Sequence, residues 1–228
     1  MPVQLELNKY TQFKYLPSYL KTIRGLKTIS DTDLVCQSIN IKPDNKSEII
    51  LDGGNLIHWS DKVIMTDRIF RENPSYERKE LLESLRKALE IETIYFVPEQ
   101  PGDFTGHADG MLRFIDDKTI LVNDYSKEKD WFKKAFEIAL HNAGLETKTF
   151  PYNPYSNSNN TDGKECYINY LQMKDIIFLP IYGMKEDDEA FKQIQSIYPG
   201  YTIVTLDCNE IANEGGVLNC ISWNIQVA

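Results

Sequence analysis

One pattern recurs along the chain and constrains its fold more than any other feature. An alternating apolar strand, a polar turn and a second strand rich in Ile and Val occur in DGGNLIHWSDKVIMTD, ADGMLRFIDDKTILVND and ECYINYLQMKDIIFLPI. The turn lysines Lys62, Lys118 and Lys174 are spaced by 56 residues, and VQLELNKYTQF places Lys9 at 53 residues before Lys62. A fixed period of this size is typical of folds built from repeated units. The spacing therefore predicts four equivalent β-hairpins.

Each hairpin is followed by a segment with helical periodicity and then by a single strand. The apolar stripes are Leu34, Val35 and Ile39; Leu81, Leu82, Leu85, Ala88 and Leu89; Trp131, Phe132, Ala135, Phe136 and Ala139; and Phe191, Ile194 and Ile197. We expect these stripes to face the core. The strands that follow them are SEIILD, TIYFVP, ETKTFPY and YTIVTLD. The chain is therefore predicted to be an α/β protein of four ββαβ modules, and GGVLNCISWNIQVA opens a fifth module that it does not complete.

Composition excludes several classes of function. The formal charge of −9 and the pI near 4.9 argue against nucleic-acid binding, because phosphate binding requires a basic face. No run approaches the roughly 18 apolar residues of a membrane span, so we expect a cytoplasmic protein with no membrane partner. The four cysteines are far apart in the sequence and form no CxxC pair, so neither a metal site nor a cofactor is implied.

Three stretches with reactive side chains lie at equivalent places, where one module passes into the next hairpin: LDGGN, GHADGMLRF and GGVLNC. Equivalent positions of a circular array converge on its axis. We therefore expect Asp52, His107, Asp109 and Cys220 to meet there. A cysteine becomes nucleophilic beside a cation or base, a histidine moves protons, and carboxylates orient the histidine or bind a cationic ligand.

These same stretches resemble a known family. ILDGGN, KVIMTDRIFRENP, GDFTGHADGMLRFID, YINYLQMKDIIFLPIYG and GGVLNCISWN occur in the order seen in the agmatine deiminase and bacterial peptidylarginine deiminase family. The resemblance extends over nearly the whole chain. It implies a pentein-type α/β propeller of ββαβ modules, in agreement with the repeat. Residues 1–228 are then one deiminase-like domain.

The resemblance also implies a hydrolase that converts a guanidino group to a ureido group and ammonia, without a cofactor. By it, Cys220 attacks the guanidinium carbon to give a thiouronium intermediate. His107 protonates the departing ammonia and then activates water, Asp109 binds guanidinium nitrogens, and Asp52 orients His107. The further substrate contacts expected from the motifs are Asn55, Arg113, Asn219 and Gly216. The implied substrates are agmatine, arginine or peptidyl-arginine, and agmatine would place the chain in polyamine biosynthesis.

Two departures from the family pattern leave an alternative open. Many agmatine deiminases have His before the nucleophile, where this chain has Asn219. The family also carries an Arg-Asp pair shortly before a Met-Pro, and this chain begins at Met1-Pro2. We therefore expect an N-terminally incomplete domain with weak or no activity, and with an open seam through which copies associate as homo-oligomers. The alternative function is a non-catalytic pentein that binds a guanidino ligand or a protein. The specificity determinants are expected in loops such as Pro151 to Gly163.

Overall fold

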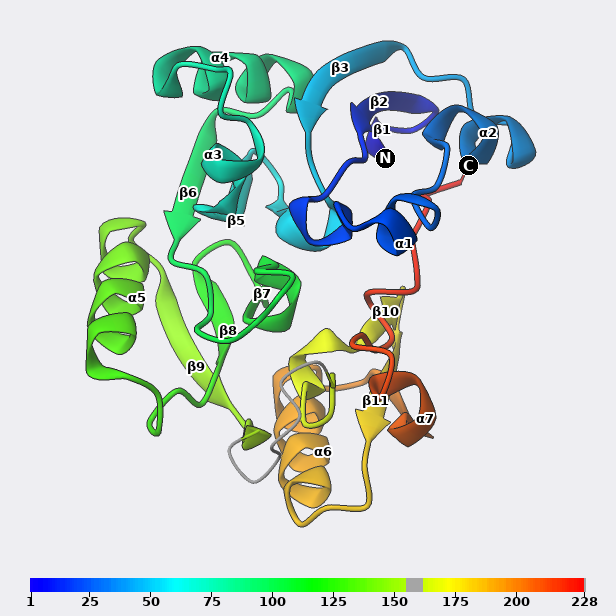
Figure 1. The fold of residues 1–228 in the computed structure, drawn as a ribbon. Coiled ribbons are helices and arrows are strands. Elements are labelled where there is room, and N and C mark those ends of the chain that lie inside the picture. Colours follow the sequence, from blue (N-terminus) through cyan, green and yellow to red (C-terminus); the bar gives the residue numbers. More distant parts are fainter. Residues whose placement is uncertain (155–161, 228) are drawn as a thin grey trace.

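The repeat is present as four three-stranded sheets that follow one another around the molecule (Figure 1). The computed structural model describes residues 1–154 and 162–227, so part of the loop from Pro151 to Gly163 lies outside the described residues. In every sheet an antiparallel hairpin is followed by a strand that pairs in parallel with the second hairpin strand. The sheets are β1 (Pro2–Glu6), β2 (Lys9–Lys14) and β3 (Asn45–Ile50); β4 (Ile57–Trp59), β5 (Lys62–Thr66) and β6 (Thr93–Val97); β7 (Leu112–Phe114), β8 (Thr119–Asn123) and β9 (Glu146–Phe150); and β10 (Leu171–Met173), β11 (Ile176–Ile181) and β12 (Thr202–Asp207).

A helical crossover connects each hairpin to its parallel strand, because two parallel neighbours cannot be joined by a tight turn. The longer helices lie at the periphery of the ring of sheets in Figure 1. The α-helices are α1 (Ile23–Leu26), α2 (Thr32–Ser38), α3 (Arg68–Glu72), α4 (Arg78–Leu89), α5 (Asp130–Asn142), α6 (Glu186–Ile197) and α7 (Asn209–Ala212). The ββαβ order predicted from the sequence is confirmed for all four modules.

The predicted apolar stripes are buried on α4 and only in part on α5. Helix α4 buries Leu81, Leu85, Ala88 and Leu89, as the periodicity indicates. Helix α5 instead buries Phe132, Phe136 and Leu140, which are spaced by four residues. Trp131 and Ala135, which were assigned to this stripe, are exposed. The large side chains at i, i+4 and i+8 thus decide which face of α5 packs on the sheet.

Helix α2 is present, but the prediction that its apolar stripe faces the core is wrong, because polar contacts place its other face on the sheet. Leu34, Val35 and Ile39 are all exposed, and Cys36 is the buried residue of the helix. The Gln12 side-chain amide donates to Thr32 Oγ1 at 2.8 Å and to Asp33 Oδ1 at 2.6 Å. These hydrogen bonds hold the polar face of α2 against β2. The apolar stripe consequently faces solvent.

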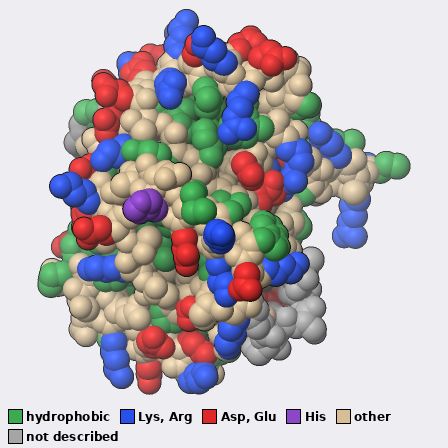
Figure 2. All heavy atoms as spheres, turned by 90° about the vertical axis from the view of Figure 1, so that its left-hand side faces the viewer, with side chains coloured by type: hydrophobic (Ala, Val, Ile, Leu, Met, Phe, Trp, Pro, Cys, Tyr) green, Lys and Arg blue, Asp and Glu red, His purple; other side chains and the backbone are tan. Residues whose placement is uncertain are grey.

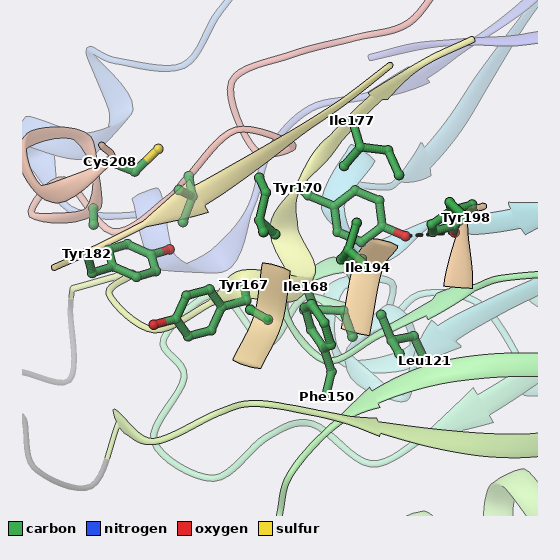
Figure 3. Packing of buried hydrophobic residues seen from close by; sticks show 14 residues of the cluster. Leu121, Phe150, Tyr167, Ile168, Tyr170, Ile177, Tyr182, Ile194, Tyr198 and Cys208 are labelled. Atoms are coloured by element: carbon green, nitrogen blue, oxygen red, sulfur yellow. Dashed lines mark hydrogen bonds between the residues drawn. The ribbon is translucent and has the colours of Figure 1, made fainter. Parts of the chain in front are cut away.

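The core comprises three clusters of buried apolar residues, each shared by neighbouring elements of the ring. Figure 3 shows the cluster of the fourth module, where Tyr167, Tyr170, Tyr182 and Tyr198 pack among Ile168, Ile177 and Ile194. Buried tyrosines require partners for their hydroxyl groups. Tyr170 and Tyr198 share a hydrogen bond of 2.9 Å, which joins the start of β10 to the end of α6.

The C-terminal segment crosses from the fourth module to the first. Of the described residues after α7, none forms a strand, so the fifth module contributes turns and irregular backbone rather than its expected first strand. Asn224 Nδ2 donates to the Gln172 carbonyl oxygen at 2.8 Å. Further on, the Gln226 amide donates to Gln4 Oε1 at 2.7 Å, and Figure 1 shows the two termini near each other. Side-chain contacts therefore connect the segment to both flanking modules.

The surface in Figure 2 is chemically mixed. On this face Lys and Arg side chains are interspersed with Asp and Glu and do not gather into a basic patch. No helix within residues 1–154 and 162–227 combines the length and the apolar character needed to cross a membrane.

Candidate active site

Three equivalent 3₁₀ turns bring reactive side chains to the centre of the ring. The turns Gly53–Asn55, Ala108–Gly110 and Tyr167–Asn169 each lead into the first strand of a hairpin. The residues immediately before them are Asp52, His107 and Cys166. The repeat therefore places these three residues at equivalent positions.

Asp52 and His107 form a closely bonded pair. His107 Nε2 donates to Asp52 Oδ2 at 2.8 Å, and both side chains are about nine-tenths buried. Burial opposes the charged imidazolium, but the hydrogen bond to Asp52 and the charges of Asp109, Asp52 and Asp103 outweigh it and raise the pKa of His107. Asp52 thus holds the ring by Nε2, and Nδ1 is the nitrogen next to Gly54.

Asp109 contacts the expected nucleophile directly. Its Oδ2 atom accepts a hydrogen bond from Asn219 Nδ2 at 2.9 Å and lies 3.6 Å from the Cys220 Sγ atom. Cys220 is exposed as a residue, but the surrounding protein partly desolvates its sulfur atom. This desolvation, followed by the neighbouring Asp109 carboxylate, raises the pKa of Cys220 to about 12. The thiol is therefore protonated at neutral pH when no cation occupies the site.

Gly54 lies next to both His107 and Asp109. A Cβ atom added to Gly54 would lie 2.5 Å from His107 Nδ1 and 2.9 Å from Asp109 Oδ1. Both atoms therefore lie against the space that a side chain at position 54 would occupy. Only glycine allows the imidazole and the carboxylate to approach the turn this closely. The structure thus brings together Asp52, His107, Asp109 and Cys220, the four residues expected from their equivalent module positions.

Asn169 is a site residue that the sequence reasoning missed. It is fully buried, and its Oδ1 atom accepts from the backbone amides of Asn219 at 3.1 Å and Cys220 at 3.2 Å. Its Nδ2 atom donates to the Asp109 carbonyl oxygen at 3.3 Å. One side chain therefore connects the turn of Asp109 to the nucleophile. The repeat contains the signal for it, because ECYIN aligns with LDGGN and GHADG.

The other expected substrate contacts divide into two groups. Gly216 and Asn219 line the cavity in front of Cys220, and a Cβ atom at Gly216 would lie 3.0 Å from the Cys220 Cβ atom. Asn55 and Arg113 are not among the described residues that line this cavity. The Arg113 guanidinium lies 3.9 Å from the Tyr170 ring centroid and donates to the Tyr170 carbonyl oxygen. Its contacts therefore stabilise the fourth module.

Asn55 is bonded to the end of β5. Its Oδ1 atom accepts from the backbone amide of Thr66 at 2.8 Å and from the Thr66 hydroxyl at 2.9 Å, and Thr66 is fully buried. The Asn55→Ala variant is expected to lower the free energy of unfolding by about 2 kcal/mol, because the buried backbone amide of Thr66 loses its acceptor. The Thr66 hydroxyl keeps a partner, the Gly106 carbonyl oxygen at 2.7 Å. Urea denaturation measures this loss.

The control for Asn55→Ala is Asn142→Ala, at an exposed position at the end of α5. Its unfolding free energy should stay within about 0.5 kcal/mol of the unmodified chain. Unchanged stability of Asn55→Ala, combined with weaker substrate binding, would contradict the structural role and return Asn55 to the substrate contacts.

The site opens into a cavity of about 1320 Å³ whose lining is strongly acidic. The charged side chains described along it are one lysine, Lys164, and six carboxylates: Asp52, Asp103, Asp109, Glu128, Asp162 and Glu214. Such a lining favours a cationic ligand. In the part of the chain that the structure describes, no group of three or more His, Cys, Asp and Glu side chains could hold a metal ion.

Comparison of the sequence with those of known proteins identifies the family of this chain. The sequence model of the Porphyromonas-type peptidyl-arginine deiminases matches residues 24–225. The chain belongs to this family. A provisionally named agmatine deiminase from Mycoplasma mycoides is 24% identical over 220 residues, which cover 82% of this chain and 60% of that protein. The chain thus spans about 60% of the length of this relative and of a similarly named protein from Mycoplasma capricolum.

Solved structures show the same fold. A provisionally named arginine deiminase from Porphyromonas gingivalis superimposes with a TM-score of 0.77 at 20% identity, over 93% of this chain and 68% of that chain. A substrate-bound cysteine-to-serine variant of C. jejuni agmatine deiminase gives 0.75 at 18% identity, over 93% and 66%. The fold is the pentein-type α/β propeller that the family resemblance implied, and its four three-stranded modules are those predicted from the repeat.

Proposed function

We propose that this chain is a hydrolase of guanidino groups that acts through Cys220. The observation that carries the proposal is the convergence of Cys220, Asp109 and the Asp52–His107 pair around Gly54. A nucleophile, a carboxylate for the guanidinium and an oriented imidazole are the groups that this hydrolysis requires. Family membership supports the same reaction class.

The raised pKa of Cys220 gives the substrate a part in its own activation. In the empty site, desolvation of the sulfur atom and the Asp109 carboxylate keep the thiol protonated. A guanidinium bound at Asp109 neutralises that carboxylate and places positive charge beside Sγ, so it favours the thiolate. The thiolate is thus formed only when a cation is present to be attacked.

The reaction then needs one proton carrier and one water. Binding of the guanidinium releases the Cys220 thiol proton to solvent water. Cys220 Sγ then bonds to the guanidinium carbon, and the imidazolium of His107 gives a proton to the departing nitrogen, which leaves as ammonia. Neutral His107 next takes a proton from water, whose oxygen adds to the thiouronium carbon. Loss of the Cys220 sulfur yields the ureido product and regenerates the thiol. Asp52 keeps Nε2 occupied, so that both transfers use Nδ1.

The cavity lining favours agmatine over free arginine. Agmatine carries a second cation at its far end, whereas arginine carries an α-carboxylate that would meet a wall of like charge. Like-charge contacts are costly in a partly desolvated site. The test is to incubate the chain with agmatine, arginine and a peptide with C-terminal arginine, and to assay ureido product and ammonia. It tests both the hydrolysis itself and the preference among substrates. We expect kcat/KM for agmatine to exceed that for arginine by about tenfold or more.

The acidic lining of the cavity also suits the non-catalytic alternative, in which the chain binds a guanidino cation without converting it. A chain that only binds guanidino compounds would retain the Asp109 contact and form no product. Calorimetry with agmatine separates the two functions. Binding without ureido product or ammonia would support the binding module, and absence of both binding and product would contradict both proposals.

The pH dependence of the rate should report His107. Because its pKa is raised, the imidazolium persists to higher pH than that of an ordinary histidine, and kcat should fall only as the pH rises through this raised value. The Asp52→Asn variant removes the negative charge that raises the pKa of His107 and leaves only a neutral amide oxygen as the acceptor for Nε2. Its falling limb should therefore move to lower pH by about one unit. Initial rates from about pH 5 to pH 10 measure this shift, and movement to higher pH would contradict the assignment.

A further inference from the structure

Tyr19 reaches the site from a segment that carries none of the repeat motifs. It lies in the short 3₁₀ turn Ser18–Leu20, between β2 and α1. The preceding Ser18 is fixed on a buried ion pair: its backbone amide donates to Glu72 Oε2 at 3.0 Å, and Arg68 Nη2 donates to its hydroxyl at 2.9 Å. Arg68 and Glu72 are themselves bonded at 3.0 Å and are at most 8% exposed. This network sets the position of Tyr19.

The Tyr19 side chain lies against the Asp52–His107 pair. Its hydroxyl donates to Asp52 Oδ2 at 3.0 Å, the same oxygen that accepts from His107 Nε2. Its ring contacts the His107 ring edge-on, with the centroids 5.8 Å apart. The Arg68 guanidinium carbon lies 5.5 Å from the Tyr19 ring centroid on another side. The phenol is therefore held in place by contacts other than the hydrogen bond.

The hydrogen bonds of Asp52 are asymmetric. Oδ2 accepts from both Tyr19 and His107, whereas Oδ1 is buried and has no hydrogen-bond partner among the residues described. Burial and the Asp52 charge raise the pKa of Tyr19 far above its ordinary value, so the phenol remains a donor at every relevant pH. The phenol and the imidazole thus share one carboxylate oxygen.

We propose that Tyr19 is a positioning residue, which fixes the plane of the Asp52 carboxylate and limits how strongly that carboxylate stabilises the imidazolium of His107. A hydrogen bond from the phenol takes up part of the charge on Oδ2, which would otherwise act on His107 alone. Tyr19 in this way keeps the pKa of His107 closer to neutrality, where the imidazole can both give and accept a proton. The role matters for catalysis only if the proposed function holds.

Other charged and titratable groups face the pair from neighbouring elements. Asp103 comes from the loop after β6 and Asp109 from the 3₁₀ turn after His107, and both charges raise the pKa of His107. On the other side are the phenol of Tyr15 and the Met1 ammonium, whose pKa burial lowers to about 6. Changing Tyr19 to Phe leaves the contacts of Asp103, Asp109 and Met1 unaltered, and removes the hydrogen bond between the Tyr19 and Tyr15 hydroxyls together with the one to Asp52. A change in the titration midpoint of His107 would then be due to loss of the Tyr19 hydroxyl.

The test is ¹⁵N imidazole NMR, which suits a chain with three histidines. In Tyr19→Phe the ring contacts remain and the donor is lost, so the titration midpoint of His107 should rise by about half a pH unit. His58 and His141 serve as internal controls and should not move. Tyr198→Phe is the matched variant, because it removes another buried phenol hydrogen bond, the one to Tyr170, in the fourth module.

The double variant Tyr19→Phe with Asp52→Asn shows whether Tyr19 acts through Asp52. In the Asp52→Asn background the Tyr19 change should no longer move the His107 midpoint. An unchanged midpoint in Tyr19→Phe, or an equal shift with and without Asp52, would overturn the proposal. None of these measurements needs turnover, so a chain that forms no ureido product can still confirm or refute the role of Tyr19.

Discussion

The Cys220→Ala variant should form no measurable ureido product, with kcat reduced by about four orders of magnitude or more, because the covalent intermediate can no longer form. The fold should be unaffected, since it is the backbone amide of Cys220 that bonds to Asn169. Cys36→Ala is the matched control, because this residue of α2 is buried and is not among the described residues lining the cavity. Its kcat should match that of the unmodified chain.

Alkylation tests whether Cys220 is activated by a cation. The empty site holds its pKa at about 12, so iodoacetamide, which is neutral, should label it slowly at neutral pH. Chloroacetamidine carries an amidinium that can occupy the guanidinium position at Asp109. Its rate at Cys220, relative to a small-molecule thiol, should exceed that of iodoacetamide by at least about tenfold, and Asp109→Asn should remove this preference. Equal labelling of Cys36, Cys166, Cys208 and Cys220 would mean that the thiol is not activated.

The repeat explains why the modules, and the convergence of Asp52, His107, Asp109 and Cys220, could be predicted from the sequence. Period-2 strands and a fixed spacing determine which segments pair, and equivalent positions in a ring converge whatever their separation in the chain. The spacing of the turn lysines predicts the exact starts of the strands less accurately. Lys9 and Lys62 begin β2 and β5, whereas Lys118 and Lys174 lie one and two residues before β8 and β11. A constant interval of 56 residues therefore marks the turns without fixing the register.

The remaining features depend on contacts that have no periodic signal. The outward-facing stripe of α2 follows from the hydrogen bonds of Gln12, which is far from the helix in sequence. Tyr19 reaches Asp52 because Ser18 binds the Arg68–Glu72 ion pair. Asn55 belongs to a site motif, yet its side chain bonds to Thr66 rather than facing the cavity. Direction of a side chain in a tight turn is set by the neighbouring strand and cannot be deduced from the motif.

Gly54→Ala should be the most damaging change outside the reacting groups. The added methyl would lie 2.5 Å from His107 Nδ1 and 2.9 Å from Asp109 Oδ1, which is closer than carbon approaches either atom in folded proteins. The imidazole must then move away from the guanidinium position or break its bond to Asp52. A displacement of about 1 Å in such a site costs on the order of 100-fold in rate, so kcat for agmatine should fall by that factor or more.

The neighbouring Gly53→Ala provides the control within the same 3₁₀ turn. A Cβ atom there would meet only the Sδ atom of Met1, at 2.8 Å, and a flexible methionine side chain can move aside. Because both variants lose a glycine of one turn, a general effect on turn stability would appear in both, whereas crowding of His107 and Asp109 affects Gly54→Ala alone. Stopped assays for ureido product and thermal denaturation of the two variants measure the difference. Similar kcat values in the two would show that Gly54 is not where the imidazole and the carboxylate meet the substrate.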